Sequence, residues 1–212
     1  MLEFFRAHGL DTARLEALAG RGNAYRKGVP EIPGCFRRLQ AEENIAIGDQ
    51  DWRVLIGNGH APEHASLYCA SQGVLISGDM LLPRISTNVS VWAAMPEANP
   101  LAWFLDSLRR LAAELPADTL VLPSHGLPFR GLPARVDQLV AHHQARCEDL
   151  RAACASPKSA AELIPVLFPR EITDAHQTMF AMGEAIAHLN YLEQARQIER
   201  TIENGIIRFI RH

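Results

Sequence analysis

The sequence predicts an α/β protein, and three local patterns carry this prediction. Short apolar runs that end at glycine indicate β-strands at residues 54–56 and 74–77. Residues 100–115 carry leucine or phenylalanine at every third or fourth position after a proline, which indicates an amphipathic helix. A further apolar strand follows at residues 120–122. A helix that connects two strands is the unit from which α/β layers are built.

The other elements are predicted from caps, turns and apolar spacing. Residues 1–22 indicate helix with Asp11 and Thr12 as possible caps, and an Asn204-Gly205 turn indicates a C-terminal hairpin. Proline and glycine mark a loop at residues 25–34, and residues 80–99 form a long loop. Strands are predicted at residues 35–39, 44–47, 52–56 and 66–69, and helices at residues 133–155, 159–167 and 174–196.

Composition limits the classes of function. The chain has 212 residues, 48% of them hydrophobic and 21% charged, which is sufficient for a globular core. The formal net charge of -3 gives no electrostatic reason to expect nucleic acid or an anionic membrane as partner. No signal-peptide pattern and no apolar run of membrane length occur. The four cysteines show no CxxC pairing, so reduced thiols and a cytoplasmic location are expected.

Two histidines and one aspartate follow predicted strands and are candidate metal ligands. His60 follows the strand that ends at Ile56, Asp79 follows the strand of residues 74–77, and His125 follows residues 120–122. The ends of neighbouring strands lie along one edge of a sheet, so the three side chains that follow these strands are expected to converge. Imidazole and carboxylate together suit zinc, iron or manganese, and one carboxylate can contact two ions.

The stretches GHAPEHASL, SGD and LPSHG resemble the later metal motifs of the metallo-β-lactamase superfamily and occur in the family's order. The resemblance covers roughly residues 1–150. It implies two divalent ions, zinc first, with iron or manganese as alternatives. It implies that His60 binds one ion, that Asp79 bridges both, and that His125 is the last ligand of the second. His64 corresponds to a histidine that supports the site rather than binding metal.

The family's principal motif, HxHxDH, does not occur in this chain. The resemblance therefore implies only the second half of an αββα sandwich at residues 1–156. Either the sequence is truncated or the gene lacks the first half, and truncation is favoured. Three ligands shared between two ions would hold them weakly or not at all, so these residues alone are expected to be inactive.

Residues 157–212 are expected to form a separate module after a boundary at Ser156-Pro157. Two helices and a hairpin resemble the winged-helix extension of some hydrolases of the same fold, which suggests DNA binding by analogy. From Ala155 onward, however, there are six basic and seven acidic residues and no basic stripe. Nucleic acid is therefore not an expected partner, and packing or substrate shaping is the preferred role.

The leading hypothesis is a metal-dependent hydrolase of a small-molecule thioester, lactone or phosphodiester, with Asp79 essential for catalysis. The resemblance implies hydroxide, generated from water at the metals, as nucleophile. In the segment of residues 80–99, Arg84, Ser86 and Asn88 are candidate substrate contacts, although a loop that only packs on the core is an equal interpretation. Two alternatives stay open. One is a non-catalytic interaction module that forms a homo-oligomer through apolar surface, and the other is an endoribonuclease.

Overall fold

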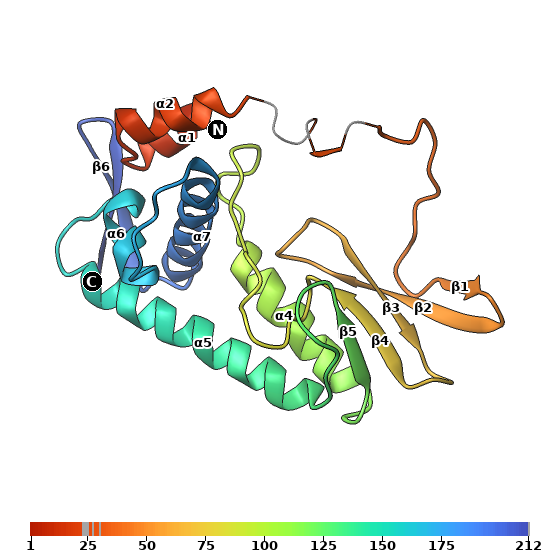
Figure 1. Ribbon diagram of the computed structural model, residues 1–212. Helices are drawn as coiled ribbons and strands as arrows, with labels where there is room; N and C mark the ends of the chain where they lie inside the picture. Colours follow the sequence, from red (N-terminus) through yellow and green to blue (C-terminus); the bar gives the residue numbers. More distant parts are fainter. Residues whose placement is uncertain (23–25, 27, 30, 212) are drawn as a thin grey trace. The chain divides into compact units, whose positions relative to one another are not determined.

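Figure 1 shows a computed structural model of the protein, which describes residues 1–22, 26, 28, 29 and 31–211. These residues form two compact units. Unit 1 comprises residues 1–37, 90–98 and 145–212, and unit 2 comprises residues 38–89 and 99–144. The loop expected at residues 25–34 lies partly outside the described residues. No helix in the described ranges is long and apolar enough to cross a membrane.

Unit 2 contains a five-stranded sheet whose strands lie side by side in chain order (Figure 1). The first four strands pair antiparallel, and the fifth pairs parallel with the fourth. A parallel neighbour needs a crossover connection, and helix α4 (Pro100–Glu114) lies in that connection. The predicted α/β class is therefore confirmed. The strands are β1 (Asn44–Ile47), β2 (Gln50–Gly57), β3 (His64–Cys69), β4 (Val74–Gly78) and β5 (Leu120–Pro123).

The strand predicted at residues 35–39 is absent from the structure, so this prediction is wrong. The sheet ends at β1, and a segment without a neighbouring strand has no main-chain partners for a ladder. Cys35 is exposed and Phe36 is 88% exposed, so neither side chain is buried on a sheet face. An apolar run indicates a strand only where a sheet edge and a core are available to it.

Helix α4 carries the apolar face that its spacing predicts. The Asn99 side chain accepts a hydrogen bond from the main-chain N–H of Ala102, and Pro100 occupies the first turn. The helix contacts β2, where Val54 and Leu55 are buried. Burial of each large apolar side chain contributes about 1.5–3 kcal/mol to folding. The large buried side chains of this helix are Leu101, Phe104, Leu105, Leu108 and Leu111.

The described residues of unit 1 include four helices, the last residues of α5 and a hairpin. Asp11 and Asp174 cap their helices through side-chain carboxylates, and Ser159 forms a capping box with Glu162. Asn204 and Gly205 have φ values of 52° and 77°, which a two-residue hairpin turn requires. The elements are α1 (Leu2–Ala7), α2 (Thr12–Gly20), α5 (Leu132–Ala153, beginning in unit 2), α6 (Ala160–Leu167), α7 (Ala175–Gln194), β6 (Ile198–Glu203) and β7 (Ile206–Arg211).

The N-terminal helices belong to the same unit as the C-terminal elements. Helix α1 contacts β7, α2 contacts α7, and the main-chain carbonyl of His8 accepts a hydrogen bond from the N–H of Ala161. The division by contacts therefore does not coincide with the boundary drawn from the sequence at Ser156-Pro157. Whether residues 157–212 can be separated as a folded module stays a prediction.

The four cysteines are free thiols, as expected for a protein without a disulfide framework. Cys69, Cys147 and Cys154 are buried. Burial raises the pKa of Cys147 to about 12 and that of Cys154 to about 11, so both thiols stay protonated and unreactive near neutral pH. These two residues therefore pack as small apolar side chains.

His8 lies in the core of unit 1, where its side chain is 1% exposed. Its ring is stacked near Phe209, with centroids 6.2 Å apart, and meets Phe4 edge-on at 4.8 Å. Burial, and then the positive charge of Arg200, lower the pKa of His8 to about 4, whereas Glu97 acts in the opposite direction. The imidazole is therefore neutral at pH 7.

We expect His8 to make the protein sensitive to acid. Because the pKa is lower in the folded protein than the ordinary value of 6.5, the unfolded chain binds the proton first. Stability should fall between pH 6.5 and pH 4, by up to about 3 kcal/mol. His8→Phe should flatten this part of the pH dependence in urea unfolding. His176→Gln, at an exposed histidine, should leave it unchanged, and equal behaviour of both variants would contradict the expectation.

Candidate metal centre

Strand topology brings the predicted ligands to one edge of the sheet in unit 2. Strands β4 and β5 are parallel, so Asp79 and His125, which follow them, lie at the same edge. Strand β3 runs antiparallel to β4 and begins at that edge, where Gly57 of β2 pairs with His64. The loop that connects β2 to β3 carries His60.

The Asp79 carboxylate lies between the two imidazoles. Its Oδ2 is 3.4 Å from Nε2 of His60, and its Oδ1 is 3.5 Å from Nε2 of His125. Both separations exceed the 2.7–3.2 Å typical of hydrogen bonds between nitrogen and oxygen. They match the spacing of two ligand atoms that share one tetrahedral ion, which is about 3.3 Å for bonds near 2 Å. The three side chains therefore converge as the strand ends predict, while their role as ligands stays a prediction.

The orientation of His60 leaves one ring nitrogen free for a ligand. Its Nδ1 lies 2.8 Å from the main-chain carbonyl oxygen of Asn88. A carbonyl only accepts hydrogen bonds, so in the neutral ring Nδ1 carries the proton and Nε2 directs its lone pair toward Asp79. A carbonyl that fixes a histidine tautomer in this way is the usual arrangement around a metal-binding imidazole.

Three polar side chains hold Asp79 from different sides. Ser124 donates through Oγ to the carboxylate oxygen Oδ1, and Thr87 donates through Oγ1 to the main-chain carbonyl. The main-chain N–H of Asp79 donates to Nε2 of His64 at 3.2 Å. Sequence reasoning missed the roles of Ser124 and Thr87. For Ser124 the signal was its position directly before His125.

His64 supports Asp79 through the main-chain N–H of that residue and is not placed as a ligand. Its Nε2 accepts the N–H of Asp79, so the neutral ring carries its proton on Nδ1. Burial, and then the neighbouring His60, lower the pKa of His64, which favours this neutral form. The ring packs against Gly78, where an added Cβ would lie 2.8 Å from Nε2. This contact explains why the residue before Asp79 has no side chain.

The donor set fits a shared two-ion arrangement but not a complete shell around one ion. One carboxylate oxygen faces each imidazole, and the tautomer of His60 is fixed, as a bridging site requires. Within residues 1–22, 26, 28, 29 and 31–211, no three histidine, cysteine, aspartate or glutamate side chains are grouped to hold one ion. Structural zinc sites use four protein ligands. Each ion would thus receive two ligands at most from these residues.

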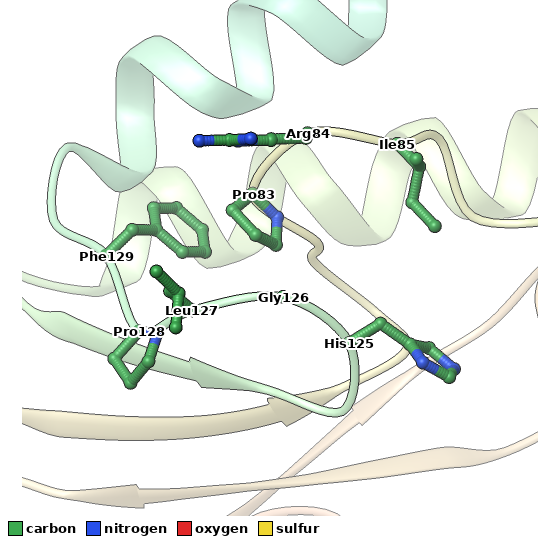
Figure 2. A pocket seen from close by; sticks show the side chains of 8 residues that line it. All are labelled: Pro83, Arg84, Ile85, His125, Gly126, Leu127, Pro128 and Phe129. Atoms are coloured by element: carbon green, nitrogen blue, oxygen red, sulfur yellow. The ribbon is translucent and has the colours of Figure 1, made fainter.

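The predicted substrate contacts lie in different environments. Arg84 lines a pocket of about 500 Å³ formed by residues 83–85 and 125–129, which Figure 2 shows from close by. Ser86 is not one of the residues that line this pocket. Asn88 acts on the site through its main-chain carbonyl, which holds His60. Of the three, only Arg84 is therefore placed as a side-chain contact for a ligand beside His125.

Removing His64 tests whether it supports the site or binds metal itself. We expect His64→Leu to weaken zinc binding by about 10- to 100-fold, because the N–H of Asp79 loses its acceptor while the three ligands remain. The matched substitution His142→Leu, at a partly buried histidine of α5, should change zinc affinity less than twofold. Competition with a chromophoric chelator measures both. Abolition of binding by His64→Leu would identify it as a ligand.

His60, Asp79 and His125 lie beyond the carboxyl ends of strands in one α/β unit. This arrangement is typical of metal-dependent α/β proteins. The chain belongs to the metallo-beta-lactamase superfamily: the model of that superfamily matches residues 4–125. A second model, described as metallo-beta-lactamase-like, C-terminal domain, matches residues 147–212.

Relatives of this chain include proteins of known structure. A beta-lactamase domain protein from Burkholderia ambifaria is 51% identical over 98% of this chain and 60% of its own, with a TM-score of 0.92. A metallo-beta-lactamase family protein from Thermus thermophilus is 35% identical over 98% of this chain and 62% of its own, with a TM-score of 0.79. The probable metallo-hydrolase YqjP of Bacillus subtilis (strain 168) is 29% identical over 94% of this chain. The chain spans 61% of YqjP.

Two finer expectations are not supported by these matches. The superfamily match begins at residue 4, so the interpretation of residues 1–156 as a second half alone lacks support, although HxHxDH is absent from the matched range. The expected winged-helix module corresponds instead to the superfamily's own C-terminal domain. The order of two helices and a hairpin is compatible with a winged helix and with this C-terminal domain, so the element order could not distinguish them. The packing of α1 and α2 within the same unit could not be foreseen from local patterns.

Proposed function

We propose that this chain contributes His60, Asp79 and His125 to a two-metal hydrolase centre. The observation that carries the proposal is the Asp79 carboxylate, whose two oxygens face different imidazoles at 3.4 and 3.5 Å. Members of the superfamily bind divalent metals, and the set of nitrogen and oxygen ligands favours zinc, with iron or manganese as alternatives. The proposed substrate is a small thioester, lactone or phosphodiester.

The residues of this chain would position and polarise rather than attack. Two bound divalent ions would supply Lewis acidity and lower the pKa of water toward neutrality, so no serine or cysteine nucleophile is required. Asp79 would fix the spacing of the centre through its two oxygens, and Ser124 would hold Oδ1 in place. His60 would present Nε2 to an ion because the Nδ1–H of its neutral ring is directed to the main-chain carbonyl of Asn88. Asp79 is therefore the residue whose loss should matter most.

Metal titration followed by a hydrolysis panel tests this function. We expect these 212 residues to bind zinc weakly, with two ions per chain at saturation in isothermal titration calorimetry. Zinc-dependent turnover of a thioester, a lactone and a phosphodiester is then measured. The enzyme in this assay is the longest natural polypeptide that includes these 212 residues. The proposal would be contradicted if the protein bound zinc no better than the His60→Leu variant does. It would also be contradicted if turnover survived the substitution His125→Leu.

A second candidate function, self-association, is favoured by one face of the sheet. Val54, Leu67, Ile76 and Leu122 are direct cross-strand neighbours and therefore form one apolar row. Val54 is fully buried, whereas Ile76 is 38% exposed. A partly exposed apolar row is a candidate contact for a second copy of this chain. Sedimentation velocity would then show concentration-dependent association that Ile76→Thr weakens, and a concentration-independent monomer would exclude this candidate.

A further inference from the structure

The pocket beside His125 is lined by apolar residues apart from Arg84 and His125 itself. Figure 2 shows one wall formed by the loop from His125 to Phe129, and the other wall formed by Pro83, Arg84 and Ile85. Leu127 is 77% exposed and Ile85 is 60% exposed, so apolar surface is presented to solvent here. A volume of about 500 Å³ lies within the range of small-molecule sites, which are mostly apolar with a few polar groups.

Hydrogen bonds to main-chain carbonyls hold both walls of the pocket. Arg135 donates from Nε to the carbonyl of Leu82 at 2.7 Å and from Nη2 to the carbonyl of Ile85 at 2.9 Å. On the other wall, Phe129 and Val121 exchange two main-chain hydrogen bonds of 2.8 and 3.0 Å. Because these hydrogen bonds fix the walls, the protein loses less conformational entropy when a ligand binds. The pocket is therefore suited to binding a ligand.

A single positive charge accompanies the apolar lining. Figure 2 shows the Arg84 side chain extending above Pro83 and Phe129. Arg84 is exposed and is the only lysine, arginine, aspartate or glutamate among the residues that line the pocket. A guanidinium beside an apolar surface favours a ligand with an apolar part and a negative charge.

We propose that this pocket binds the apolar chain of an anionic acyl compound, with its head group beside His125. This inference rests on the proposed hydrolase function and narrows its substrate class to acyl esters or thioesters with a medium-length apolar chain and a nearby negative charge. The acyl chain of the ligand would lie along Pro83, Leu127 and Phe129, and Arg84 would pair with its anionic group.

Binding of simple fatty acids tests the pocket without turnover. Butyrate, hexanoate, octanoate and octanol are titrated into the 212-residue protein without metal and followed by nuclear magnetic resonance shifts. We expect affinity to rise with chain length, by up to about fourfold per methylene. Octanoate should bind about two- to fivefold more tightly than octanol because of Arg84. No dependence on chain length would overturn the proposal.

Matched variants separate the pocket from general surface effects. Leu127→Ser should weaken both octanoate and octanol by about tenfold. The control Phe36→Ser, at a side chain that is 88% exposed and outside the pocket, should have no effect. Arg84→Gln should remove the preference for octanoate over octanol, whereas Arg109→Gln, on the exposed face of α4, should preserve it. Equal losses in the pocket variants and in their controls would refute the site.

Failure of this inference and failure of the proposed function give different results. If octanoate binds as expected but zinc neither binds nor supports hydrolysis, the pocket stands and the hydrolase proposal fails. If zinc-dependent hydrolysis occurs at equal rates for acetyl and octanoyl thioesters, and Leu127→Ser leaves both rates unchanged, the hydrolase stands and the acyl pocket is refuted.

Discussion

Replacing Asp79 with alanine is expected to remove most of the zinc binding of these residues, together with the zinc-dependent hydrolysis proposed above. The carboxylate is the only group in the described part of the chain that faces both His60 and His125, at 3.4 and 3.5 Å. Its removal leaves each ion with one imidazole from these residues. Because loss of a residue that merely supports a ligand costs 10- to 100-fold in metal affinity, loss of the shared ligand should cost more than about 100-fold.

Two companion variants define the cause of that loss. Asp79→Asn keeps the shape of the side chain but removes the charge, and it should lose nearly as much zinc affinity as alanine. Asp106→Ala removes an exposed aspartate that pairs with Arg109 one turn away, and it should bind zinc normally. The readouts are zinc affinity by chelator competition and the circular dichroism of the unliganded protein. Tight zinc binding by Asp79→Ala would refute the shared-carboxylate site.

The candidate site could be predicted from sequence because strand ends are local features. A few apolar residues followed by a turn indicate where a strand ends, and His60, Asp79 and His125 each lie within a few positions of such an end. The parallel pairing of β4 with β5 then follows from the helix between them. Helix caps at Asp11 and Ser159 were predictable for the same reason, because the cap and its partner are three residues apart.

The remaining parts depend on contacts between distant residues. Asn88 serves the site through a main-chain carbonyl, which every residue possesses, so its side chain gave no signal. Arg135 lies on α5 and reaches the carbonyls of Leu82 and Ile85, about fifty positions earlier in the chain. The N-terminal helices join the C-terminal unit through packing that no local pattern encodes. The strand expected at residues 35–39 failed for a similar reason, since no neighbouring strand was available.

Gly59, directly before His60, is the position in unit 2 where a single methyl group should destabilise the fold most. Its φ of +108° is a conformation that residues with a side chain rarely adopt. A Cβ at this position would lie 2.5 Å from the main-chain oxygen of Pro100 and 2.5 Å from Cβ of Phe104. Both atoms belong to the rigid first turns of α4, so the loop rather than the helix would have to move.

We therefore expect Gly59→Ala to lower the free energy of unfolding by about 3 to 5 kcal/mol, through backbone strain and steric overlap together. The urea midpoint, followed by fluorescence of Trp52 and Trp103, should fall by roughly 1 to 2 M. Gly73→Ala is the matched control, because Gly73 also has a positive φ, of 62°, but no atom lies within 4 Å of its added Cβ. That variant should lose only about 1 to 2 kcal/mol, the cost of the left-handed backbone alone. Equal losses in the two variants would show that the loop is not held against α4. A larger loss in Gly59→Ala, together with weakened zinc binding by the folded fraction, would show that this contact fixes the position of His60.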